Sequence, residues 1–214
     1  MMIPSPVLPR RALGLLLGAG ALSLVGPPAA RAGFPPGSAI QGELPDLRFR
    51  MTRASDGQPV TAAAYRGTVV VTYFGFTRCT DTCPLTMYNL ALILRRMGPL
   101  ASRMRMLFIT IDPGYDTVPR LRRYLAQFGP PPEIDGLHGT PAELAAMAKR
   151  YFVEYRAPTG PDAPDPVSAI SHSSFAYVFG PRGRSQDILA TIGSAVIDVA
   201  AMAEGFARLA RTAG

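Results

Sequence analysis

The chain has 214 residues, 48% of them hydrophobic, which is enough for one domain with a sizeable core and short extra segments. Its formal net charge of +7 comes almost entirely from arginines, because Lys149 is the only lysine. No basic run is interleaved with aromatic residues, which argues against a nucleic-acid-binding protein. The charge still suits docking on an acidic partner or on an anionic membrane surface.

The N-terminal residues 1–32 have the pattern of an export signal. Arg10 and Arg11 form a positive start, residues 12–25 are apolar, and residues 30–32 have the Ala-x-Ala pattern of a cleavage site. The apolar run is short for a membrane-spanning helix. An uncleaved N-terminal anchor is the main alternative, and the arginine pair also allows a twin-arginine export route.

These features predict three segments: an export signal or anchor over residues 1–32, a Pro/Gly linker over residues 33–42 and a folded domain over residues 43–214. We expect the folded domain to lie outside the cytoplasm, in the periplasm or at the outer face of the inner membrane. It would be associated with the membrane only if the N-terminal segment stays uncleaved.

The folded domain opens with an alternating apolar and polar stretch over residues 44–52, and the turn signal at residues 56–57 predicts a hairpin there. A short helical or turn segment is expected at residues 61–65. Hydrophobic periodicity then predicts alternating strands and helices. The predicted strands cover residues 69–74, 104–111 and 134–137, and the predicted helices cover about 84–97, 117–128 and 141–152.

The last third of the chain contains a predicted edge strand at residues 152–155 and a long Pro/Gly/Asp loop at residues 156–170. A hairpin with strands at 175–179 and 186–191 and an amphipathic helix at 194–210 close the domain. Alternating strands and helices imply a partly parallel sheet with helices on both faces. We therefore predict an α/β, thioredoxin-like fold: a central mixed sheet flanked by helices, with an N-terminal β-hairpin extension.

The two cysteines of the chain, Cys79 and Cys83, lie where the first long strand turns into a helix. Backbone N–H groups and the helix dipole at such a turn lower the pKa of a thiol, and the thiolate is the form that binds metal or attacks a disulfide. A spacing of four residues places the two sulfurs on one helix face, where they can form a disulfide or hold one soft metal ion. Two sulfurs do not complete a tetrahedral zinc site, and a purely structural disulfide is the alternative in an oxidising compartment.

His172 follows the long loop and precedes a strand that would be central in the predicted fold. That position can bring its imidazole over the cysteine turn. Two thiolates and an imidazole suit Cu(I), and a further weak ligand would suit Cu(II). A histidine beside a loop is more often structural, and we interpret the second histidine, His138, as a cap or turn residue.

At these residues the chain resembles the Sco/SenC family of copper-binding assembly factors for cytochrome c oxidase. The resemblance extends over roughly residues 40–210 and rests on four blocks in the same order. They are residues 74–84 with a C-x3-C-P motif, residues 110–113 followed by Asp116 and Thr117, residues 136–140, and residues 171–173 followed by 181–183.

The resemblance implies that Cys79, Cys83 and His172 bind copper. It also implies delivery of copper to the binuclear copper site of an oxidase subunit, or reduction of the cysteines of that site. Two positions depart from the family pattern. Ser171 stands where an aspartate is usual, which leaves open what orients the imidazole. Arg78 stands where a histidine is common, and its charge would favour a thiolate.

Other candidate ligands are better interpreted as structural residues. Asp81, between the cysteines, is favoured as a carboxylate at a helix N-terminus rather than a weak ligand. Asp112 and Asp116 are predicted to be turn and capping residues, and Met87 and Met97 fall at the helical spacing of core residues.

Four functions are compatible with these residues. The first is a copper metallochaperone that uses Cys79, Cys83 and His172, with an oxidase copper-site subunit or other periplasmic copper or thiol proteins as partners. The second is a thiol-disulfide oxidoreductase in which Cys79 and Cys83 form the redox pair and His172 is dispensable. The third is a peroxidase on the same fold, although no separate resolving cysteine is present. The fourth is a redox or copper sensor that uses the same residues.

Overall fold

The computed structural model of the chain describes residues 33–34, 39–40, 44–156 and 171–212. The chain divides into two compact units, Met1–Ala30 and Arg31–Gly214. The predicted export signal or anchor lies outside the described residues, as does nearly all of the predicted loop at 156–170. Within the described residues, no helix is long and apolar enough to cross a membrane.

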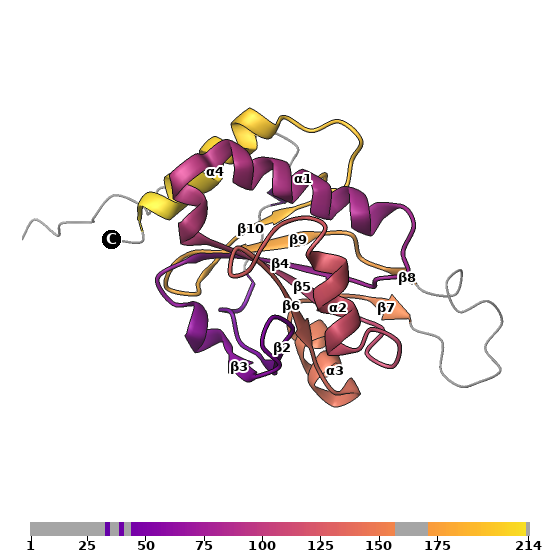
Figure 1. The fold of residues 1–214 in the computed structure, drawn as a ribbon. Coiled ribbons are helices and arrows are strands. Elements are labelled where there is room, and N and C mark those ends of the chain that lie inside the picture. The colour runs from indigo at the N-terminus through magenta and orange to yellow at the C-terminus, as the bar shows by residue number, and fades with distance from the viewer. Residues whose placement is uncertain (1–32, 35–38, 41–43, 157–170, 213–214) are drawn as a thin grey trace, which may run out of the picture. The chain divides into compact units, whose positions relative to one another are not determined.

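The second unit is built on a mixed sheet whose eight described strands have the order β1-β10-β9-β4-β5-β6-β2-β3 (Figure 1). These strands are β1 (Ala39–Ile40), β2 (Arg50–Arg53), β3 (Pro59–Thr61), β4 (Val69–Gly75), β5 (Met104–Thr110), β6 (Ile134–His138), β9 (Ala176–Phe179) and β10 (Ser185–Leu189). A separate two-stranded sheet consists of β7 (Tyr155–Arg156) and β8 (Ser171–His172).

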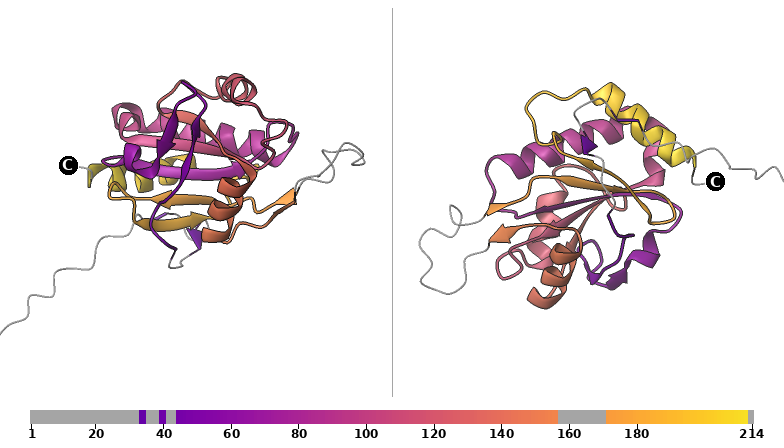
Figure 2. Two further views of the ribbon diagram at one scale, coloured as in Figure 1. Left: turned by 90° about the horizontal axis from the view of Figure 1, so that it is seen from below. Right: turned by 180° about the vertical axis from the view of Figure 1, so that it is seen from behind.

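Helices cover both faces of the large sheet, as the predicted fold requires. Helix α1 packs beside α4 on one face, and α2 and α3 lie on the other (Figure 1; Figure 2, right). The helices are α1 (Thr82–Met97), α2 (Val118–Leu125), α3 (Pro141–Arg150) and α4 (Val199–Arg211), with 3-10 turns η1 (Ala62–Tyr65) and η2 (Gly98–Arg103). The thioredoxin-like α/β fold is therefore confirmed.

The centre of the sheet explains why the cysteine turn has a fixed place. Every residue of β4 is buried, because the strand is covered by helices on both faces. It pairs in parallel with β5 and antiparallel with β9, and β5 pairs in parallel with β6. A run of β-branched and aromatic residues buried on both faces is typical of such a central strand. The turn that follows β4 therefore lies at the carboxyl edge of the sheet and is fixed in position by a buried strand that is paired on both sides.

The ends of several elements differ from the prediction. Strand β2 begins at Arg50 rather than 44, because the preceding backbone bonds elsewhere: Leu47 N donates to the carbonyl of Gly183 and Arg48 N donates to the hydroxyl of Tyr151. The predicted linker contains β1, which pairs with β10 and forms the edge of the sheet. Helix α4 begins only at Val199, where the side chain of Asp198 caps it.

Helix α3 starts at the predicted residue, Pro141, but ends in a way that was not predicted. Thr140 and Glu143 form a capping box at the start of the helix. At the other end Phe152 has a left-handed backbone with φ 55°, and the amides of Phe152 and Val153 donate to the carbonyls of Lys149 and Ala148. This is the Schellman arrangement, in which glycine is usual. Phe152 is 75% exposed. The helix termination takes the place of the predicted strand at 152–155, and β7 starts only at Tyr155.

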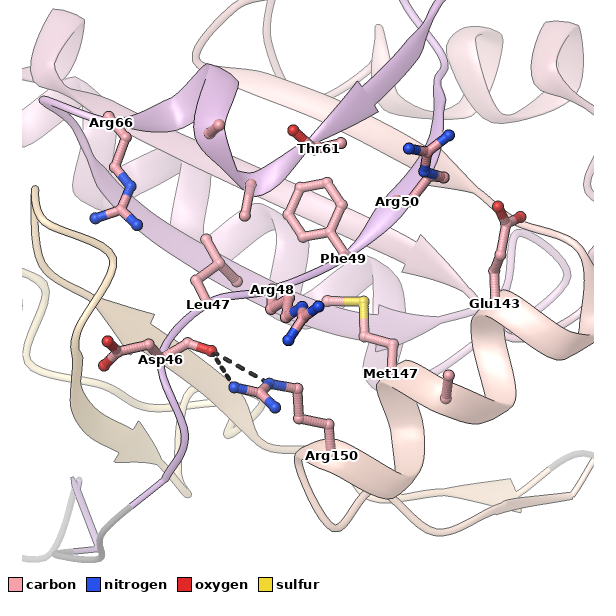
Figure 3. A pocket seen from close by; sticks show the side chains of 13 residues that line it. Asp46, Leu47, Arg48, Phe49, Arg50, Thr61, Arg66, Glu143, Met147 and Arg150 are labelled. Carbon is pink, nitrogen blue, oxygen red and sulfur yellow. Dashed lines mark hydrogen bonds between the residues drawn. The ribbon is translucent and has the colours of Figure 1, made fainter.

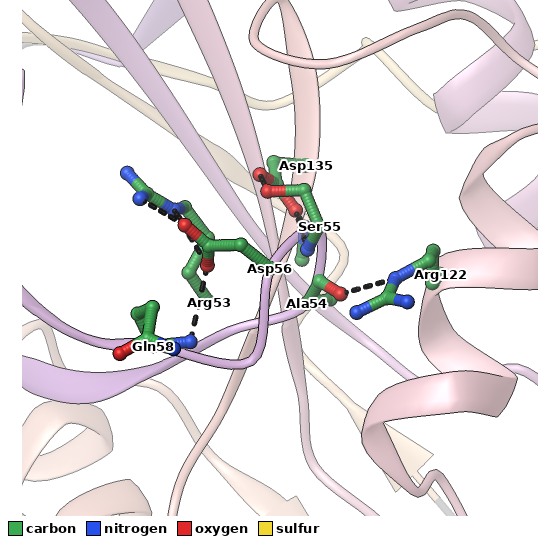
Figure 4. A network of polar contacts seen from close by, with 8 residues as sticks. Arg53, Ala54, Ser55, Asp56, Gln58, Arg122 and Asp135 are labelled. Carbon is green, nitrogen blue, oxygen red and sulfur yellow. Dashed lines mark hydrogen bonds and ion pairs between the residues drawn. The ribbon is translucent and has the colours of Figure 1, made fainter.

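A buried carboxylate ties the N-terminal hairpin to the rest of the domain (Figure 4). Asp135 of β6 accepts hydrogen bonds from the amide of Ser55 at 3.0 Å, from the hydroxyl of Ser55 and from the amide of Gly136 at 2.7 Å. Arg122 of α2 donates to the carbonyl of Ala54 at 2.7 Å. The turn between β2 and β3 is therefore fixed to β6 and α2 by polar contacts rather than by apolar packing alone.

We expect Asp135→Ala to lower the free energy of unfolding by about 2–4 kcal/mol, because it removes a charged acceptor and leaves buried donors at Ser55 and Gly136 unpaired. Urea unfolding of the reduced protein measures the effect.

The matched control is Asp56→Ala, which removes a carboxylate of the same turn from an exposed pair with Arg53. Exposed pairs contribute little to stability, so the control should unfold close to the unsubstituted protein. Equal losses in the two variants would contradict the role assigned to Asp135.

Candidate metal centre

The turn between β4 and α1 carries both cysteines. The amide of Cys79 donates to the carbonyl of Phe76 at 3.2 Å, which closes the turn, and Cys83 lies in the first turn of α1. Cys79 is half-buried, whereas Cys83 is completely buried. Both are free thiols. The predicted strand-to-helix placement of the pair is confirmed, with one sulfur open to solvent and one enclosed.

The two cysteines differ in acidity because they interact and are buried to different extents. The amide of Cys83 donates to the sulfur of Cys79 at 3.5 Å. Hydrogen bonding from the side chain of Cys83 is the main cause that holds the pKa of Cys79 well below its ordinary value; weaker contributions come from His172 and from backbone amides. The same bond and burial raise the pKa of Cys83. Cys79 is therefore the more acidic thiol of the pair.

His172 lies directly against the buried sulfur. Its Nε2 is 3.4 Å from the Sγ of Cys83, and its Nδ1 is 3.0 Å from the carbonyl of Ser173. A carbonyl can only accept, so Nδ1 carries a hydrogen and donates it to this carbonyl, which turns Nε2 toward the sulfur. The group that orients the imidazole is thus the backbone carbonyl of Ser173. Orientation by a backbone carbonyl is common for histidines that bind metals.

Aromatic rings enclose the imidazole. The rings of Tyr73 and Phe76 both meet His172 edge-on at centroid distances of 5.9 Å. The hydroxyl of Tyr73 is 3.7 Å from the Sγ of Cys83. A Cβ at Gly75 would lie 2.9 Å from that sulfur, so only glycine leaves room for it. The sequence analysis did not assign Tyr73, Gly75 or Phe76 to the site, because the continuous apolar run of β4 marks them only as buried residues.

The loop before Cys79 is held by a buried aspartate. Asp116, with no exposed surface, accepts hydrogen bonds from the amide of Thr77 at 3.0 Å, from the hydroxyl of Thr77 and from the hydroxyl of Thr110 at 2.7 Å. These bonds join the loop to the end of β5. Asp116 is therefore structural, as predicted, but it braces the cysteine loop rather than capping a helix.

Arg78 does not act on the thiolate in the way its charge suggested. Its guanidinium is ion-paired with Asp112 at 2.5 Å and stacks on the ring of Tyr115 at 4.1 Å from the centroid, with Arg120 over the same ring at 4.3 Å. The charge is thus neutralised within the loop. Hydrogen bonds at the cysteine pair, not Arg78, lower the pKa of Cys79.

The remaining candidates lie in structural positions. Asp81 is the N-cap residue of α1, which agrees with its interpretation as a carboxylate at a helix N-terminus. Its side chain is exposed and makes no capping hydrogen bond. His138 is not the predicted cap or turn residue: it is the last residue of β6, where it pairs with Thr52, and its Nε2 lies 3.1 Å from the carbonyl of Pro113. Met87 and Met97 are core residues at 1% and 7% exposure.

The structure brings the predicted ligands together only in part. Cys83 contacts both Cys79 and His172. Among the described residues, however, no group of three or more histidine, cysteine, aspartate or glutamate side chains is arranged to hold a metal ion as it stands. The assignment of all three residues as ligands stays a prediction.

Comparison with known proteins places the whole domain. The SCO1/SenC family profile matches residues 40–208. The mouse protein "SCO2 homolog, mitochondrial" is 35% identical over 133 residues, which cover 61% of this chain and 51% of the relative. A "SCO2-like protein" of Rickettsia felis is 31% identical over 129 residues, 60% of this chain and 62% of the relative. The chain thus spans about half the length of the mitochondrial relatives that it matches.

Solved structures agree with the profile. Bradyrhizobium japonicum ScoI with copper bound aligns with a TM-score of 0.64 at 28% identity, covering 78% of this chain and 98% of that one. Yeast Sco1 with copper bound aligns with a TM-score of 0.65 at 28% identity, covering 80% and 90%. The fold found here is therefore that of copper-bound proteins of comparable size.

The acidity of Cys79 gives a first prediction for this site. Because its pKa is lowered in the folded protein, Cys79 should be a thiolate at about pH 6, where an ordinary thiol is protonated. Cys83→Ala removes the main stabilising hydrogen bond and should raise the pKa of Cys79 toward its ordinary value. The measurement is the thiolate absorbance in the far ultraviolet as a function of pH.

Cys83→Ser is the matched control, because a serine hydroxyl still donates to the thiolate and should retain much of the lowered pKa. If the alanine and serine variants titrate alike, the hydrogen bond from Cys83 is not the cause.

Proposed function

Because this chain belongs to the SCO1/SenC family, we propose that it is a copper metallochaperone that delivers copper to, or prepares, the binuclear copper site of a cytochrome c oxidase subunit. Copper is the cargo in this proposal, and Cys79, Cys83 and His172 hold it. The copper-bound state of the ScoI and Sco1 neighbours supports the choice of metal.

The observation that carries the proposal is the contact of 3.4 Å between Cys83 Sγ and His172 Nε2. Two donors on one tetrahedral metal with zinc-like bond lengths are roughly 3.6 Å apart, so these two atoms already have the spacing of a shared ion. The thiolate of Cys79 lies one helical turn away beside the amide of Cys83. A soft sulfur pair with a neutral imidazole suits Cu(I) better than Ca²⁺, Mg²⁺ or Mn²⁺.

The burial of the three residues suggests how cargo would leave. Cys83 is fully buried beside Tyr73, whereas Cys79 is half-exposed. An incoming ligand from a partner protein would reach the copper from the Cys79 side and replace that thiolate first. Transfer by stepwise ligand exchange then needs no free copper ion.

The cysteine pair also supports the second candidate, a thiol-disulfide oxidoreductase. An open thiolate at Cys79 could attack a partner disulfide, and the buried thiol of Cys83 would then displace the partner's cysteine to leave a Cys79–Cys83 disulfide. The protein would be oxidised and the partner reduced by two electrons. His172 has no required part in this reaction.

The remaining assignments belong to the same proposal. The partner is the copper-site subunit of an oxidase, with other periplasmic copper or thiol proteins as further candidates. The folded domain at residues 43–214 acts in the periplasm or at the outer face of the inner membrane, after export by residues 1–32. The predicted leader pattern supports this location.

The test is Cu(I) binding by the reduced full-length chain, measured by competition with a chromophoric Cu(I) chelator. We expect one tightly bound copper, and we expect His172→Ala, Cys79→Ala and Cys83→Ala each to weaken it by at least about 100-fold, because each removes a ligand where even indirect partners contribute 10–100-fold.

His138→Ala is the control, since that imidazole is engaged at the end of β6 and should leave copper affinity unchanged. If His172→Ala binds copper as tightly as the unsubstituted protein, the three-ligand site is wrong. If no copper is held tightly but the cysteine pair reduces a model disulfide, the oxidoreductase is the better assignment.

A further inference from the structure

A large groove lies outside the metal centre, between residues 46–50, η1 and α3 (Figure 3). Its volume is about 790 Å³, which is large enough for several residues of an extended chain. None of the residues assigned to the metal centre lines it. The groove is therefore a feature separate from the metal centre.

Four arginines surround this groove, and their charges are not cancelled. Arg66 donates to the carbonyl of Arg182, and Arg150 donates to the carbonyl of Asp46 at 3.1 and 3.3 Å. These bonds fix two guanidiniums in place without neutralising them. Arg48 and Arg50 are exposed, and in the described part of the chain none of the four is ion-paired with a carboxylate.

The two acidic residues of the lining do not balance this charge. The carboxylate of Glu143 is engaged with the amide and hydroxyl of Thr140 at the start of α3. Asp46 is exposed, and the contact with Arg150 is made by its backbone carbonyl rather than by its carboxylate. The groove therefore keeps a net positive charge of roughly two at its rim, which favours an anionic occupant.

The lower part of the groove is apolar. Leu47, Phe49 and Met147 are buried beneath it, and alanines 62, 63 and 146 contribute only methyl groups to its walls. Figure 3 shows Leu47, Phe49 and Met147 between the guanidiniums. An occupant must therefore combine negative groups with aliphatic surface.

We propose that the groove binds an extended acidic segment of a partner protein, with carboxylates on the arginines and an aliphatic side chain against the apolar lining. Arginine forks match carboxylates in a bidentate geometry. A bilayer surface cannot follow a concave groove. A nucleic acid would meet the carboxylates of Asp46 and Glu143 and would find no exposed aromatic ring for its bases, because Phe49 is 8% exposed.

Binding of an acidic segment at the groove does not require bound copper, because no residue of the metal centre lines it. Binding at the groove would leave Cys79 and His172 uncovered, so a partner could be held there while it exchanges ligands at the metal centre. Attachment at a second point raises the effective concentration of the reacting groups. The groove could hold a partner of an oxidoreductase equally well. Peptide binding at the groove therefore tests a different claim from Cu(I) binding at the metal centre.

The test uses the copper-free full-length chain and a blocked peptide of about seven residues with glutamates on both sides of a leucine, which spans roughly 23 Å when extended. We expect saturable binding, with backbone amide shift changes concentrated in residues 46–50, 62–66 and 143–150. Arg48→Gln/Arg50→Gln should weaken the peptide by at least about tenfold, and a peptide with glutamines in place of glutamates should not bind.

The matched control is Arg95→Gln/Arg96→Gln, which removes the same charge from exposed positions at the end of α1. It should change peptide binding less than about twofold, and equal unfolding curves would establish that both double variants are folded. Equal weakening in the two double variants, shift changes outside the groove, or no saturable binding would overturn the proposal. So would tighter competition by phosphatidylglycerol vesicles or inorganic polyphosphate than by the peptide.

Discussion

The site depends on the burial of the Cys83 sulfur at the carboxyl edge of the sheet. That atom fits only because residue 75 has no side chain, and it contacts the hydroxyl of Tyr73 and the imidazole of His172. Burial raises the pKa of Cys83, and hydrogen bonding from its side chain lowers the pKa of Cys79. One buried thiol therefore affects the acidity of its neighbour and contacts the third candidate ligand.

Around this atom, the fold uses carboxylates to hold loops rather than to bind ions. Asp116 braces the loop before Cys79, Asp135 braces the turn of the N-terminal hairpin, and Asp112 neutralises Arg78. Because these acids are occupied by structural partners, the thiolate and imidazole are left as the soft donors of the region. The separation of hard and soft ligands suits selection of a soft metal.

The sequence predicted the fold class, both cysteines at a strand-to-helix turn and the core positions of Met87 and Met97, because residue type and local spacing report these features directly. It did not predict what depends on backbone atoms or distant pairing. The carbonyl of Ser173 that orients His172 has no residue-type signal. Strand β1 depends on an edge offered by β10, and the missing strand at residues 44–49 depends on a hydroxyl from Tyr151. The neutralisation of Arg78 depended on a partner 34 residues away.

The small sheet of β7 and β8 holds His172 less firmly than the large sheet holds the two cysteines. Both cysteines lie in the turn and first helical residues that follow the fully buried strand β4, whereas His172 lies on a ladder with only two paired residues on each strand. Short exposed ladders open at a small fraction of the free energy of global unfolding. Detachment of the imidazole therefore leaves the pairing of the large sheet intact, so that a bound ion can be released by local opening while both cysteines stay in place.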